Sequence, residues 1–183
     1  MAVNTRAVDP ALRARLVDGS LAGTWSLDPS RSSVTLQSKS MWGLVPVRGT
    51  FGQVSGEAVI TPGGEASGTI TVGSASVDTK NGARDKHLRS ADFFESDAYP
   101  DIVFTARQVK LVGDEATAIG TLRVRDAARP LSFPVAVSAD GAGEVRLDAE
   151  VHIDRSDFGL TWNRLGTASM KNTLTIHAVF TRG

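Results

Sequence analysis

The chain has 183 residues, with 20 basic and 20 acidic side chains and no cysteine. This length suits one domain with a proper hydrophobic core. The balanced charge argues against a nucleic-acid-binding protein and against a polybasic membrane-binding protein, and the lack of cysteine excludes disulfides, a thiolate nucleophile and a cysteine-ligated zinc site. No segment approaches the roughly 20 consecutive apolar residues of a membrane-spanning helix, so we expect no stable membrane insertion.

The first 22 residues are expected to form an N-terminal helical extension. The stretch VDPALRARLVDG predicts a short helix, with Asp9 as its N-cap, Pro10 in the first helical position, and Leu12 and Leu16 on one face. A helix this short needs packing against the main body, and it could also serve a homodimer contact. A secretory signal needs about 7–15 apolar residues in a row; charged residues interrupt every candidate run here, so we expect a cytoplasmic protein.

From Trp25 onward, apolar and polar residues alternate with a period of two. The clearest run, EVRLDAEVHID, places Val145, Leu147, Ala149 and Val151 on one face and charged residues on the other. The same alternation recurs in SSVTLQSKS, VPVRGTFGQV, GTITVGSAS, DIVFTARQVK, ATAIGTLRV, LSFPVAVSA and TLTIHAVF. One polar face indicates antiparallel pairing, and about eight such strands predict an all-β domain over residues 23–183, either a closed barrel or a sandwich.

The predicted inner face contains unusually small side chains, and these allow two interpretations. They can mark a close approach of opposite walls, or they can leave room for a small ligand inside an eight-stranded barrel. The small residues at inward positions are Ser38, Ser40, Ser74, Ser76, Ala106, Ala116, Ala118, Gly120 and Ala149.

The segment RDKHLRSADFFES, residues 84–96, places charged side chains around His87. A catalytic cluster, a ligand clamp and a structural cap are the three interpretations. A general base needs an orienting partner and a nucleophile or water in reach, and the pattern fits better with a helical cap around residues 82–97. In this cap, Ser90 is the expected N-cap of a second helical turn, and Phe93 and Phe94 cover one end of the barrel.

The other histidines do not predict a metal site. If the last two strands form a hairpin, His177 lies opposite about residue 148, too far from His152 to share the ~2 Å bonds of one metal ion. In the connecting loop, Arg155 beside Ser156 is expected to hydrogen-bond backbone groups and set the turn into the last strand. Trp25, Trp42 and Trp162 fall at element boundaries, where they pack in the core and rim or line the mouth of a cavity.

Several ordered blocks of the chain resemble the YceI-like family, also called polyisoprenoid-binding or bacterial lipocalin-like proteins. The resemblance covers about residues 24–181. The blocks are TWSLDPSRSSV, RGTF, VDTKNGARDKHLRSADFFESDAYPDIVF, GTLRVRDAARPLSF and RSDFG. Two departures stand out: many relatives begin with a secretion signal, and many carry a histidine near the position of Ser40 that is missing here.

The resemblance implies a single eight-stranded antiparallel lipocalin-like β-barrel over residues 23–183 that stores or transports a long isoprenoid, such as a quinone or polyprenyl lipid, without catalysis or a cofactor. An enzyme acting on a small amphiphile through the His87 region and a ligand-free interaction module are the alternatives. Arg84, His87 and Arg89 are candidate contacts for the head group of a lipophilic ligand. The predicted cavity-lining residues are Leu36, Trp42, Phe51, Ile70, Val72, Phe93, Phe94, Phe104, Leu122, Phe133, Val135, Leu147 and Ile176.

Overall fold

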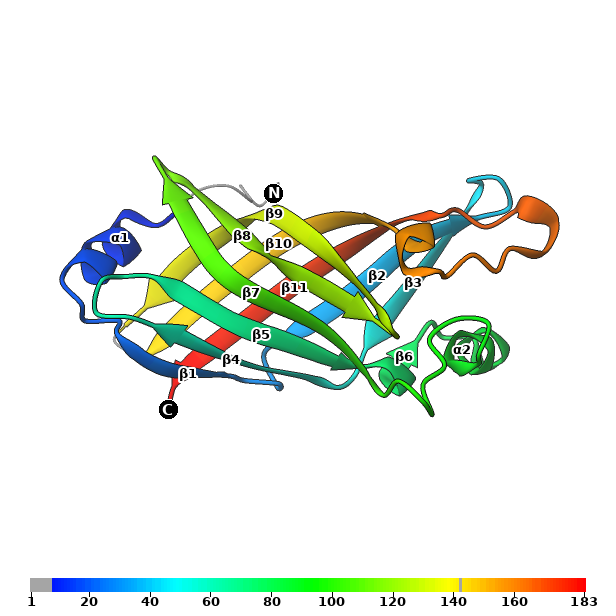
Figure 1. The fold of residues 1–183 in the computed structure, drawn as a ribbon, viewed down its shortest axis with the longest axis horizontal. Coiled ribbons are helices and arrows are strands. Elements are labelled where there is room, and N and C mark those ends of the chain that lie inside the picture. Colours follow the sequence, from blue (N-terminus) through cyan, green and yellow to red (C-terminus); the bar gives the residue numbers. More distant parts are fainter. Residues whose placement is uncertain (1–7, 142) are drawn as a thin grey trace.

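A computed structural model of the protein describes residues 8–141 and 143–183, and its strands form one antiparallel sheet that closes into a barrel (Figure 1). The elements in chain order are α1 (Pro10–Val17), β1 (Gly23–Leu27), β2 (Ser33–Ser40), β3 (Val45–Phe51), β4 (Val54–Ile60), β5 (Ala66–Gly73), η1 (Ser74–Ser76), β6 (Val77–Asp78), α2 (Gly82–Arg89), β7 (Asp101–Val112), β8 (Glu115–Val124), β9 (Ala127–Asp140), β10 (Glu144–Asp154), η2 (Arg155–Phe158), η3 (Arg164–Gly166) and β11 (Lys171–Arg182).

The last strand, β11, closes the barrel. The strand order runs β1-β4-β5-β7-β8-β9-β10-β11, and β11 returns to pair with β1. The first part of β11, residues 173–177, pairs instead with β2, while residues 180–182 pair with β1. Strands β1 and β2 therefore follow one another along the same edge of β11 and together act as one strand of the barrel. On their other side, β1 pairs with β4 and β2 pairs with β3. The predicted eight-stranded antiparallel barrel is confirmed.

Helix α1 lies at one end of the barrel. The side chain of Asp9 caps it by accepting a hydrogen bond from a backbone N–H in the first turn, and Leu12 and Leu16 are buried, as predicted. Both leucines join the core cluster with Trp25, whose Nε1 donates to the Leu21 carbonyl at 3.1 Å. The division of the chain into an extension and a barrel domain stays a prediction. No helix in the described ranges is long and apolar enough to cross a bilayer.

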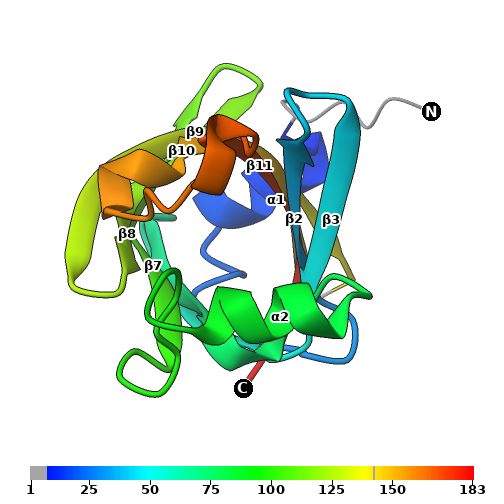
Figure 2. The same ribbon diagram turned by 90° about the vertical axis from the view of Figure 1, so that its right-hand side faces the viewer.

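Helix α2 crosses the opposite end of the barrel (Figure 2). Asn81 caps it, because its side chain accepts a hydrogen bond from the Arg84 N–H. The helix covers only the first half of the predicted range 82–97, and turns follow it. The residues after Ser90 form turns rather than the expected second helix; its extended backbone ends α2, and its hydroxyl donates to the His87 carbonyl at 2.6 Å and accepts from the Asp92 N–H at 3.4 Å.

Candidate ligand-binding site

A cavity of about 360 Å³ lies inside the barrel at the α2 end. Its walls are mainly apolar side chains that point inward from β2, β3, β5, β7, β8 and β11, with α2 and the turn after it along one side. Nine of the predicted lining residues border this cavity, and they are Leu36, Phe51, Ile70, Val72, Phe93, Phe94, Phe104, Leu122 and Ile176. Their contact with a ligand stays a prediction.

A second, smaller cavity of about 120 Å³ lies at the α1 end. Phe133 and Leu147 border this second cavity rather than the first. Ile70, Phe104 and Ile176 border both, so these three side chains form the wall between the two spaces. The interior is thus divided along its length. Val135 is fully buried and borders neither cavity, so the structure does not place it where it was predicted.

The predicted position of Trp42 in the cavity wall is wrong. Strand β2 ends at Ser40, and Trp42 lies in the following turn with its side chain exposed to solvent. Both Met41 and Trp42 have positive φ angles, 52° and 55°. These left-handed residues break the alternation of the strand, so the inward parity of Ser40 does not continue to Trp42.

The small inward residues serve both of the roles considered for them. Ser38 and Ser40 border the large cavity, and Ala118 borders the small one. Gly120 instead marks a close approach, because a Cβ atom added there would lie 2.0 Å from the carbonyl oxygen of Thr105 on the neighbouring strand. Small residues therefore leave room along part of the barrel and permit tight backbone contact elsewhere.

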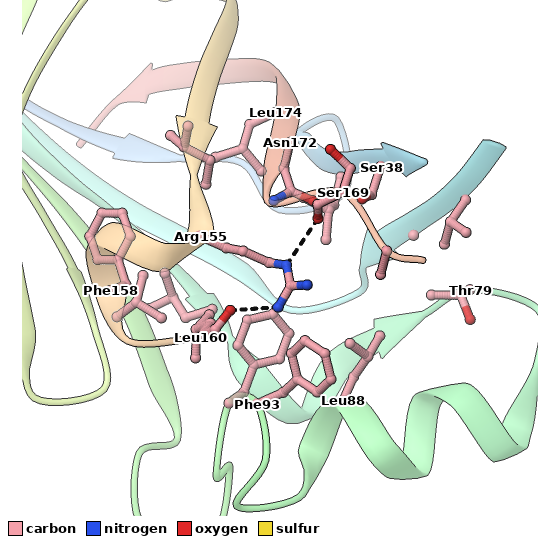
Figure 3. A pocket seen from close by; sticks show the side chains of 18 of the residues that line it. Ser38, Thr79, Leu88, Phe93, Arg155, Phe158, Leu160, Ser169, Asn172 and Leu174 are labelled. Atoms are coloured by element: carbon pink, nitrogen blue, oxygen red, sulfur yellow. Dashed lines mark hydrogen bonds between the residues drawn. The ribbon is translucent and has the colours of Figure 1, made fainter. Parts of the chain in front are cut away.

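Arg155 is the central polar group of the large cavity, and only 7% of it is exposed (Figure 3). Its Nε donates to the Ser169 carbonyl at 3.0 Å, and its Nη1 donates to the carbonyls of Trp162, at 3.0 Å, and Leu160. It thus ties the loop into β11 by backbone hydrogen bonds, as predicted. Burial lowers the pKa of Arg155 from its ordinary value, although a guanidinium stays charged in proteins.

The guanidinium of Arg155 also has an unused donor. Its Nη2 is buried and has no hydrogen-bond partner among the described residues. Cationic or potentially cationic side chains border the large cavity, namely Lys39, Arg84, His87 and Arg164 in addition to Arg155, whereas no Asp or Glu of the described chain does so. The polar part of this cavity therefore offers donors and positive charge.

The charged residues of α2 that were predicted to contact a head group have different surroundings. Arg84 borders the cavity, and its Nε donates to Thr79 Oγ1 at 2.8 Å. The same hydroxyl donates to the buried carboxylate of Asp85 at 2.6 Å, so Thr79 links Arg84 to Asp85. Arg89 does not border the cavity; it donates to the carbonyls of residues 75 and 77 and fastens α2 to the barrel.

His87 borders the cavity from the α2 side, and aromatic rings surround it. Its Nε2 lies 3.0 Å from the Asp92 carboxylate, and its ring meets Trp162 edge-on at 4.2 Å and Phe93 at 5.2 Å between centroids. This arrangement orients the imidazole at the mouth. In the described part of the chain, no three His, Cys, Asp or Glu side chains lie together in a way that could hold a metal.

Sequence reasoning missed most of the lining that comes from the segment between β10 and β11. Phe158, Leu160, Thr167 and Ser169 border the large cavity from this segment. Alternation carries no information about irregular backbone, so parity could not assign them. The block RSDFG was the available signal, because it begins with the arginine that holds the segment against the barrel.

Together these features define a lipocalin-like barrel whose apolar cavity reaches one end and carries a polar, cationic margin there. A family model described as the YceI-like domain matches residues 25–181. The chain belongs to this family.

Two curated relatives are protein YceI of Shigella flexneri and of Escherichia coli O157:H7, each 35% identical over 112 residues. Each match covers 58% of this chain and 58% of the relative, so it spans less than two thirds of those proteins. Among solved structures, BcnA of Burkholderia cenocepacia superposes with a TM-score of 0.76 at 24% identity, covering 84% of this chain and 98% of that chain. A polyisoprenoid binding domain from Saccharophagus degradans gives 0.72 at 18% identity, covering 87% and 98%. These structural matches show the shared fold.

Proposed function

We propose that this protein binds a long-chain amphiphile, an isoprenoid lipid such as a quinone or polyprenyl compound, and stores or transports it without catalysis. The observation that carries the proposal is the apolar cavity of about 360 Å³ inside the barrel. The transfer of a hydrocarbon chain from water into such a space is favourable, and it depends on the apolar area buried rather than on the exact structure of the chain. The solved domain from Saccharophagus degradans that is described as polyisoprenoid binding supports the same ligand class.

The size of the cavity sets the length of chain that it can hold. A protein cavity of about 150 Å³ accommodates benzene, so about 360 Å³ has room for roughly 14 carbon atoms, or about three isoprene units. At about 0.8 kcal/mol per buried methylene, this chain contributes roughly 11 kcal/mol. Association costs on the order of 4–15 kcal/mol. Shorter prenyl chains should therefore bind weakly.

The small cavity offers an extension of this site. By the same proportion, its volume of about 120 Å³ holds roughly five carbon atoms, or about one more isoprene unit. A chain enters it when the wall of Ile70, Phe104 and Ile176 yields by side-chain rotation. Affinity should therefore rise from a prenyl chain of about 15 carbons to one of about 20, and then level off.

The head group is proposed to lie at the α2 end. Arg84 and His87 border the cavity there, and Arg155 joins them as a candidate contact because its Nη2 has no partner among the described side chains. These groups are donors with positive charge, so a head group with oxygen acceptors suits them. Arg89 is left out of this contact set because it donates to backbone carbonyls away from the cavity.

Mass spectrometry of organic extracts from gently purified protein tests the proposal. We expect a co-purifying lipid with a prenyl chain. Isothermal titration calorimetry with geranylgeraniol then measures affinity and should give a negative heat-capacity change, as apolar burial requires. An extract without lipid together with no measurable geranylgeraniol binding would contradict the proposed function.

A further inference from the structure

Two neighbouring loops at the α2 end expose large apolar side chains to solvent. The first is the turn between β2 and β3, residues 41–44, where Trp42 is 74% exposed and Leu44 is 81% exposed. The second is residues 161–167 before β11, where Leu165 is 84% exposed. We call these two loops the tip loops. Apolar side chains of this size gathered in one place on a protein surface mark an interaction site.

The tip loops are held together by backbone hydrogen bonds. The Trp42 N–H donates to the Thr167 carbonyl at 3.1 Å, and the Ser169 N–H donates to the Lys39 carbonyl at 2.8 Å. In Figure 1 both loops project beyond the barrel at the same end. They therefore form one continuous surface, although they are more than a hundred residues apart in the chain.

Backbone conformation presents these side chains outward at some energetic cost. Trp42 and Leu165 have φ angles of 55° and 73°. Bulky residues rarely adopt the left-handed region, where glycine or asparagine would be favoured. Strained backbone of this kind persists only where the surrounding structure holds it in place, and it is found mostly at functional sites. For the stability of the fold alone, glycine would suit these two positions better than an exposed tryptophan or leucine.

The tip loops also lie in a basic part of an otherwise neutral chain. Residues 38–48 and 160–171 contain Lys39, Arg48, Arg164 and Lys171 and no Asp or Glu. All four side chains are exposed, and among them Lys171 faces Asp154 across the pair of β10 and β11. An anionic phospholipid surface attracts such side chains by about 1 kcal/mol each. Tryptophan is also the residue that prefers the boundary between head groups and acyl chains.

The apolar surface is continuous with the mouth of the cavity. Lys39, Trp162, Arg164 and Thr167 belong to the tip loops or their flanks, and all four border the large cavity. A ligand that entered between them would pass directly from the tip surface into the barrel.

We propose that the tip loops dock on an anionic phospholipid bilayer, with Trp42, Leu44 and Leu165 inserted at the head-group level and the four cations against the lipid phosphates. Docking brings the mouth of the cavity to the membrane, from which an amphiphile enters without crossing water; this last step rests on the proposed function. The contact is peripheral and reversible, because three apolar side chains and four cations bury little area compared with a spanning helix.

Vesicle flotation with the full-length protein tests the docking surface. The vesicles are phosphatidylcholine alone or phosphatidylcholine with phosphatidylglycerol at about 3:1. We expect wild-type protein to bind the mixed vesicles at about 0.05 M salt, and to bind at least tenfold more weakly at about 0.5 M salt. The double variant Trp42→Asn with Leu44→Ser should also bind at least about tenfold more weakly. Asparagine suits the left-handed backbone at position 42, so the turn keeps its shape.

A matched control comes from the opposite surface of the molecule. Val17 and Val112 are 82% and 62% exposed and lie outside the tip loops. The double variant Val17→Ser with Val112→Ser should bind vesicles as the wild type does. Equal loss of binding in both double variants, or wild-type binding that is the same with and without phosphatidylglycerol, would overturn the docking surface.

Two further measurements separate this inference from the proposed function. Geranylgeraniol binding in the absence of vesicles should be unchanged in the variant with Trp42→Asn and Leu44→Ser, because neither side chain borders the cavity. Wild-type protein that binds geranylgeraniol but no vesicles overturns the docking surface alone, whereas vesicle binding without geranylgeraniol binding overturns the proposed function alone. A wild-type dimer in sedimentation velocity that this variant dissociates would assign the tip loops to a second copy of the chain.

Discussion

The substitution Leu122→Trp should block ligand binding while leaving the barrel folded. Leu122 lies on β8, is buried, and borders the large cavity. Its partner on the adjacent strand β7 is Phe104, which also borders the cavity. An indole at this position has open space in front of it, so it should enter the cavity rather than force the strands apart. Overpacking a filled core costs about 1–3 kcal/mol, and we expect the lower end of that range here.

The expected loss of affinity follows from the atoms that are displaced. A tryptophan side chain has six more non-hydrogen atoms than a leucine side chain, and it should exclude about six carbon atoms of the roughly 14 that the cavity holds. At about 0.8 kcal/mol per methylene this removes about 5 kcal/mol of binding free energy. The dissociation constant of a prenyl alcohol should rise on the order of a thousandfold.

Calorimetric titration with geranylgeraniol measures the dissociation constant, and urea unfolding measures the stability of the same protein samples. The control is Arg123→Trp, which adds an indole on the exposed face of the same strand. That variant should keep wild-type affinity. A stably folded Leu122→Trp protein whose dissociation constant stays within about threefold of wild type would refute ligand binding inside this cavity.

Three further changes test the parts of the structure that hold the site. Gly120→Ala places a Cβ atom 2.0 Å from a carbonyl oxygen, so urea unfolding should show a loss of about 3 kcal/mol or more; wild-type stability would contradict the close approach. Arg155→Met removes the hydrogen bonds to three loop carbonyls, so amide exchange in residues 160–169 should accelerate, and unchanged protection would contradict the anchoring role. Hydrogen bonds from Ser30 and Arg31 lower the pKa of Asp28 to about 2. Because this folded-state pKa lies below the unfolded value of ~3.9, Asp28 stabilises the fold above about pH 4, and that contribution is lost as the pH falls toward 2. Asp28→Asn should flatten this part of the stability profile in urea unfolding, and an identical profile would contradict the assignment.

Much of the fold was predictable because successive side chains of a barrel strand point alternately into the apolar interior and out to water. The run over residues 144–154 forms β10 with the predicted faces. The hairpin register predicted for His177 is also confirmed: it pairs with Asp148, and its Nδ1 lies 2.6 Å from that carboxylate. That β1 and β2 share the same edge of β11 was not predictable, because alternation does not show where one strand leaves its partner and another takes its place.

The site was predictable where residues lie on strands and failed where the chain leaves them. Inward parity placed Leu36, Ile70 and Leu122 beside the cavity. It could not say how far along the barrel a residue lies, so Phe133 and Leu147 appear at the second cavity. Nor could it follow the chain through left-handed turns, which is why Trp42 was assigned to the interior although it lies outside.

The open interior of the barrel supports the proposed function on energetic grounds. A cavity left in a protein core costs about 24 cal/mol per Å³, so about 360 Å³ forgoes on the order of 9 kcal/mol relative to a filled barrel. This is comparable with the whole stability of a typical domain, about 5–15 kcal/mol. Larger side chains at Ser38 and Ser40, which border the space, would recover part of that energy. A hydrocarbon chain in the cavity recovers it in another way, because it restores the missing contacts when it binds. The small residues therefore lower the stability of the empty barrel, and binding of the proposed ligand would return that stability.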